Sequence, residues 1–70
     1  MTLFTEVDQM FRKNKPFVVD IVNGGRANEL LEWVVSNYPR QNWDTLDAVG
    51  RSYFYFTFEK DAVLFKLRWA

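Results

Sequence analysis

Cysteine and histidine are both absent from this sequence of 70 residues. Their absence excludes disulfide bonds, thiolate and imidazole metal ligands, cysteine nucleophiles and histidine general bases. The nine Lys and Arg residues balance the nine Asp and Glu residues, which argues against a general polyanion binder. No apolar run approaches the roughly 18 residues of a membrane span, and the N-terminus has no signal-peptide pattern. We therefore expect a cytoplasmic, non-catalytic protein that uses no metal or cofactor.

Aromatic residues, in contrast, are abundant, with seven Phe, three Trp and three Tyr. An apolar content of 49% predicts a folded chain, and the length allows a single domain over residues 1–70. A domain this small buries only about 60% of the surface of its unfolded chain. So many rings exceed what one small core needs, and we expect some of them on the surface, in contact with a partner. The alternative is that all of them fill the core.

Two amphipathic helices are predicted from apolar residues at helical spacing. The first covers residues 2–13, with Thr2 as its capping residue and Pro16 closing the segment. The second covers residues 27–38, and its apolar stripe consists of Ala27, Leu30, Leu31, Val34, Val35 and Tyr38. Trp33 lies off this stripe, so its ring is either half-exposed or packed against another element.

Three strands are predicted from β-branched and aromatic residues. Residues 17–22 form the first, and Asn23-Gly24-Gly25 ends it in a tight turn where glycine supplies a positive φ. Residues 42–49 hold a short edge strand anchored by Trp43, which a turn at Gly50-Arg51 follows. Residues 51–58 form the third strand. Alternation places Phe54, Phe56 and Phe58 on one of its faces and Tyr53, Tyr55 and Thr57 on the other.

The C-terminal segment, residues 61–69, fits two patterns. Asp61 can cap a helix that carries Ala62, Phe65 and Trp69 on one stripe. Alternation of Val63, Phe65, Leu67 and Trp69 equally suits a strand paired with residues 51–58. We favour the helix, because acidic residues open the segment and basic residues lie near its end, where each offsets the helix dipole.

The third strand, Arg-Ser-Tyr-Phe-Tyr-Phe-Thr-Phe, resembles the eight-residue signature of RNA-recognition motifs. Arg51, Tyr53 and Phe58 match the signature, Tyr55 is aromatic where Phe is usual, and Ser52, Phe54 and Phe56 depart from it. The order strand, helix, strand, strand, helix is also similar to that family. The resemblance implies a split βαβ, ferredoxin-like fold with a bare sheet face, on which Tyr53 and Tyr55 stack bases while Arg51 lies near a phosphate.

Residues 55–69 resemble the C-terminal ends of small proteins of tailed bacteriophages. Those ends consist of an aromatic strand, an acidic step and the pattern Asp-Ala-x-x-Phe-x-Leu-x-Trp. In this chain Asp61, Ala62, Phe65, Leu67 and Trp69 carry the pattern. The resemblance implies a phage-encoded accessory protein, and proteins of this kind bind host enzymes or virion components.

These patterns together predict an α+β fold. Its antiparallel sheet has three strands, or four, with helices on one face in a split βαβ, ferredoxin-like arrangement and an extra N-terminal helix. The predicted function is a protein-interaction module that binds or inhibits a host protein, or binds itself. Single-stranded nucleic-acid binding through the aromatic strand 51–58 and a role in the virion or its assembly are alternatives.

The predicted partner-binding residues are Tyr53, Tyr55, Arg51 and Trp33, because Tyr, Trp and Arg are enriched among interface anchors. If the two tyrosines lie on a bare face, replacing both by alanine leaves the fold intact and abolishes binding. Asp44 and Asp47 lie close together near a turn, where two carboxylates can bind a hard cation. Without an Asp-x-Asp-x-Asp-Gly loop we expect these two to be solvated acids.

Overall fold

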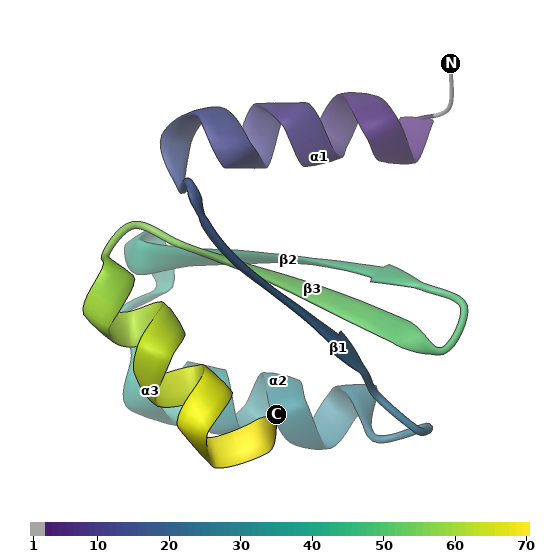
Figure 1. Ribbon diagram of the computed structural model, residues 1–70, viewed down its shortest axis with the longest axis vertical. Coiled ribbons are helices and arrows are strands. Elements are labelled where there is room, and N and C mark those ends of the chain that lie inside the picture. The colour runs from purple at the N-terminus through teal and green to yellow at the C-terminus, as the bar shows by residue number, and fades with distance from the viewer. Residues whose placement is uncertain (1–2) are drawn as a thin grey trace.

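In the computed structural model, which describes residues 3–70, three α-helices pack on the two faces of an antiparallel sheet (Figure 1). The elements in chain order are α1 (Leu3–Asn14), β1 (Phe17–Val22), α2 (Ala27–Asn37), a short 3₁₀ helix η1 (Arg40–Asn42), β2 (Trp43–Ala48), β3 (Arg51–Phe56) and α3 (Glu59–Trp69). The C-terminal segment is therefore a helix. Thr2, the predicted cap of the first helix, lies outside the described residues.

The three strands are ordered β1-β3-β2, and both neighbouring pairs are antiparallel. β3 therefore lies in the centre, with Phe56 opposite Phe17 on one side and opposite Trp43 on the other. A tight turn joins β2 to β3, and Gly50 adopts the positive φ of 74° that this turn requires. The α+β fold class, with a three-stranded antiparallel sheet, is confirmed.

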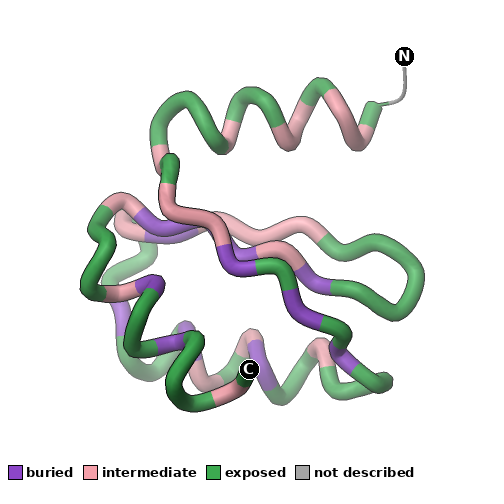
Figure 2. The backbone as a smooth tube through the Cα atoms, viewed as in Figure 1, coloured by how far each residue is buried: buried purple, intermediate pink, exposed green. Residues whose placement is uncertain are grey.

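The core lies between the sheet and the layer formed by α2 and α3. Strand alternation sends Phe54 and Phe56 into this layer, where Phe65 of α3 meets them at ring-centroid distances of 4.7 and 5.7 Å. Leu30 and Val34 of α2 complete the centre. The buried segments in Figure 2 accordingly line the inner sides of these elements.

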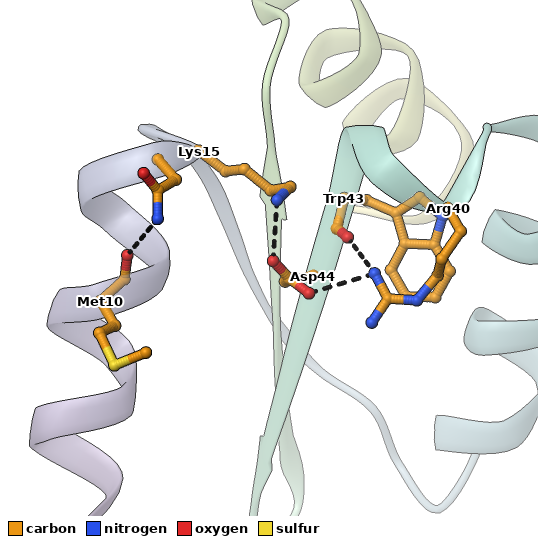
Figure 3. Close-up of polar contacts among 6 residues, drawn as sticks. Met10, Lys15, Arg40, Trp43 and Asp44 are labelled. Atoms are coloured by element: carbon orange, nitrogen blue, oxygen red, sulfur yellow. Dashed lines mark hydrogen bonds and ion pairs between the residues drawn. The ribbon is translucent and has the colours of Figure 1, made fainter.

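α1 lies on the opposite face of the sheet from α2 and α3 (Figure 1). None of its described residues is fully buried, so it packs through one side only. Two polar contacts lie at its C-terminal end. The Asn14 amide donates to the Met10 carbonyl at 3.5 Å, and Lys15 Nζ lies 3.0 Å from the Asp44 carboxylate of β2 (Figure 3). The ion pair fixes the end of α1 to the sheet.

Three details of the predicted elements are wrong. β3 ends at Phe56 and the chain bends to start α3, so the alternation stops and Phe58 is exposed. α3 begins at Glu59 after Phe58 at the cap position, which places Asp61 inside the helix. Val35 is exposed, although it lies on the predicted stripe, because α3 packs on the Trp33 side of α2.

Candidate interaction surface

The tyrosine face of β3 is not bare, because α1 covers it. Tyr55 is 0% exposed, its ring meets Phe11 edge-on at 5.2 Å, and its hydroxyl donates to the Asp8 carboxylate. Tyr53 is half-buried beneath Phe4, with ring centroids 5.3 Å apart. Burial, followed by the bond to Asp8 and its charge, raises the pKa of Tyr55. The expectation of an open stacking face is therefore wrong, since the apolar side of α1 occupies it.

The other two predicted anchors lie apart from the tyrosines and from each other. Arg51 is exposed at the start of β3 and donates to Asp20 of β1 at 2.7 Å. This bond, together with the charge of Asp20, raises the pKa of the Arg51 guanidinium. Trp33 lies on the other side of the sheet, where its half-buried ring meets Trp69 and Phe65 at 6.2 and 6.0 Å. The four residues therefore do not form one surface.

The two acids near the turn do not converge on a cation. Asp44 points to the α1 side of β2 and accepts from Arg40 at 3.1 Å as well as pairing with Lys15 (Figure 3). Asp47, three residues on, points to the other face and accepts from the Ser52 hydroxyl at 2.8 Å. Among the described residues, no group of three or more carboxylates is placed to hold a metal ion.

The outer side of α3 presents a stripe of aliphatic residues, Val63, Leu64 and Leu67, that are 50%, 51% and 78% exposed. Helical geometry explains the arrangement. Ala62 and Phe65 point into the core, and the three residues of the stripe, spaced i, i+1 and i+4 from Val63, lie on the opposite side of the helix. We call these three residues the α3 stripe. The binding residues predicted from the sequence include none of these three, although their helical spacing is present in the sequence.

A recess flanks the α3 stripe on each side. One, of about 420 Å³, lies between Leu64, Phe58 and Lys60 on the α3 side and residues 37–39 and Asn42 on the other. Its floor includes Tyr38, whose hydroxyl donates to the Asp61 carbonyl at 3.2 Å and whose pKa is raised, first by burial and then by the charge of Asp61. The second recess, of about 280 Å³, lies between α3 and residues 16–19 at the start of β1. The α3 stripe therefore protrudes between two recesses, and each recess can accept side chains of a partner.

The outer edge of β1 borders the second recess. Within residues 3–70, β1 pairs only with β3. The Asn23 amide donates to the Gly50 carbonyl at 3.0 Å and so extends the β1–β3 ladder by one hydrogen-bonded pair. Because such pairs alternate along antiparallel strands, the backbone groups of Val18, Asp20 and Val22 are directed away from β3. They form an open edge beside α3.

The charges of the chain are not evenly distributed, although they sum to zero. Arg12, Lys15, Arg40 and Arg51 all pair with carboxylates. Over the described part of the chain, the remaining five cations have no ion pair. Lys13 is on α1, and the other four lie on α3 or against it: Arg26, Lys60, Lys66 and Arg68. Arg26 and Arg68 both contact the Trp69 ring, at 5.8 and 4.4 Å from its centroid. The exposed part of α3 therefore carries apolar residues together with cations that gather at its C-terminal end, whereas Glu59 and Asp61 lie at its N-terminal end.

Comparison with known proteins finds no match for this chain among protein-family models, curated proteins or solved structures. Among the described residues, no helix is long and apolar enough to cross a membrane.

Proposed function

We propose that this chain is a non-catalytic protein-interaction module that binds a partner protein through the outer side of α3. The α3 stripe is the observation that carries the proposal. Each of its aliphatic side chains is at least half exposed, and full burial of one such side chain is worth about 1.5–3 kcal/mol. A partner that covers the stripe recovers much of this free energy.

The surroundings of the stripe favour a protein as the partner. The recesses of about 420 and 280 Å³ on either side of it can accept side chains, and the basic residues around it form the polar rim of a typical interface. Nucleic-acid binding has less support, because stacking needs accessible rings and the rings of the β3 face lie beneath α1. Following the resemblance to bacteriophage proteins, we propose that the partner is a protein of a bacterial host.

The proposal can be tested by affinity capture from a nuclease-treated bacterial lysate. The test variant is Leu64→Ser combined with Leu67→Ser. The matched control is Leu3→Ser combined with Met10→Ser, which changes residues of similar exposure, 75% and 64%, on the outer side of α1. Circular dichroism establishes that both variants are folded. We expect one bacterial protein to be captured by the unmodified chain and by the control variant but not by the α3 variant.

Two outcomes contradict the proposal. Equal capture by all three forms places the binding surface away from α3. Capture from an untreated lysate that disappears after nuclease treatment supports nucleic-acid binding instead.

A further inference from the structure

The open edge of β1 and the side of α3 that faces the recess beside it can together bind one more strand. The outward N–H and C=O groups of Val18, Asp20 and Val22 can pair with an extended segment, as in β-strand addition. Side chains of such a strand alternate between the two faces of the sheet. Every second one enters the recess of about 280 Å³ beneath α3, where Ala62 and Val63 provide apolar contacts.

The charges around this recess indicate the chemistry of the segment. Glu59 lies at one end of the recess and Lys66 at the other. Beyond Lys66, Arg68 and Arg26 gather around Trp69, and no carboxylate among residues 3–70 pairs with any of these three cations. An acidic side chain at this end gains ion pairs without breaking existing ones.

A second copy of the chain is a poorer occupant of the edge than an acidic partner. Antiparallel pairing of β1 with its own copy about a two-fold axis keeps both α3 helices on the same face of the joined sheet. Pairing through the outward residues Val18, Asp20 and Val22 also sets Asp20 of one copy directly opposite Asp20 of the other. Like charges that face each other across an interface are unfavourable.

We propose that β1 binds an extended, acidic segment of the partner protein, which adds as a fourth strand with alternate apolar residues under α3. This inference rests on the proposed function and specifies how the partner binds. It explains why Val63 is exposed although it lies next to a sheet edge, since the added strand would cover it.

A yeast-displayed library of random peptides tests the inference directly. Sorting against the labelled chain should enrich peptides that have apolar residues at every second position and acidic residues near one end. In amide hydrogen exchange measured by NMR, bound peptide should slow the exchange of Val18, Asp20 and Val22. The outward amides of β2 at Thr45 and Asp47 lie on the opposite edge of the sheet and serve as the internal control.

Charge reversal provides a second measurement that does not disturb the sheet. Lys66→Glu should weaken the binding of an enriched acidic peptide by about two- to fivefold, as expected for an exposed ion pair. Lys13→Glu, at another exposed cation without an ion pair among the described residues, should leave the affinity unchanged.

Several results would overturn the inference. The inference is wrong if no peptide is enriched, or if the enriched peptides are basic or have their apolar residues at helical spacing. It is also wrong if bound peptide does not slow amide exchange at the β1 edge, or if the free chain is a dimer in which that edge is already protected. If binding depends on Leu64 and Leu67 but the β1 amides exchange freely, the proposed function stands and strand addition fails. If binding depends on neither, both fail.

Discussion

Replacing Tyr55 by alanine removes the most deeply buried of the side chains that join α1 to the sheet. The ring is 0% exposed, meets Phe11 at 5.2 Å and carries the hydroxyl that donates to Asp8. The first expectation from the sequence was that replacing this residue and Tyr53 leaves the fold intact. The structure predicts the opposite, because both side chains are packed under a helix.

The size of the effect follows from burial. Truncation of a large buried aromatic residue to alanine costs about 3–5 kcal/mol. At about 0.05–0.15 kcal/mol per residue, a chain of 70 residues has a total stability of roughly 3.5–10 kcal/mol. Tyr55→Ala therefore removes much or all of the stability. Tyr55→Phe keeps the ring, loses only the hydrogen bond to Asp8, and should cost about 1 kcal/mol.

Guanidinium unfolding followed by far-ultraviolet circular dichroism measures both changes. We expect a Tyr55→Phe transition close to that of the unmodified chain and a Tyr55→Ala transition at much lower denaturant, or no folded baseline at all. If Tyr55→Ala unfolds at the same denaturant concentration as Tyr55→Phe, the ring contributes nothing and the packing of α1 described here is wrong.

Three further predictions concern polar and backbone features of the fold. Ser52→Ala should lower the free energy of unfolding by about 1–3 kcal/mol, because the buried Asn23 amide loses its acceptor at 3.0 Å; an unchanged denaturation midpoint would contradict this. Since burial raises the pKa of Tyr55 and of Tyr38, the folded state keeps protons that the unfolded state releases. Stability should therefore fall as pH rises above about 10, less steeply in Tyr55→Phe, and parallel pH curves from thermal unfolding would refute the assignment. Gly50→Ala should cost about 1–2 kcal/mol because φ is positive there, and no loss in thermal stability would mean that the turn relaxes freely.

Much of the fold could be predicted because local patterns and tertiary packing agree. The β-branched run of β1 has the predicted bounds, since the Asn23-Gly24-Gly25 turn ends it and both glycines adopt a positive φ. The alternation of β3 correctly placed Phe54 and Phe56 in the core. The prediction that Phe58 is buried was wrong, because side chains alternate between the two faces only within the strand, which ends at Phe56. No glycine or proline marks that end in the sequence.

The candidate interaction surface was harder to predict, because the exposure of a side chain depends on which helix covers its face of the sheet. Alternation correctly put Tyr53 and Tyr55 on one side of β3, but nothing local indicates that α1 folds back across that side. The contacts that hold it there, between Phe4 and Tyr53 and between Phe11 and Tyr55, join residues far apart in the chain. The exposure of the α3 stripe likewise depends on tertiary packing, since its residues look like core residues in the sequence.

Site-specific photocrosslinking can establish whether the outer side of α3 binds a partner protein. A diazirine amino acid replaces Leu67 in one form of the chain and Leu3 in another, two positions that are 78% and 75% exposed on different helices. After irradiation in bacterial lysate, we expect one dominant protein adduct from position 67 that is absent from position 3. The same adducts from both positions, or adducts from position 3 alone, would contradict the claim.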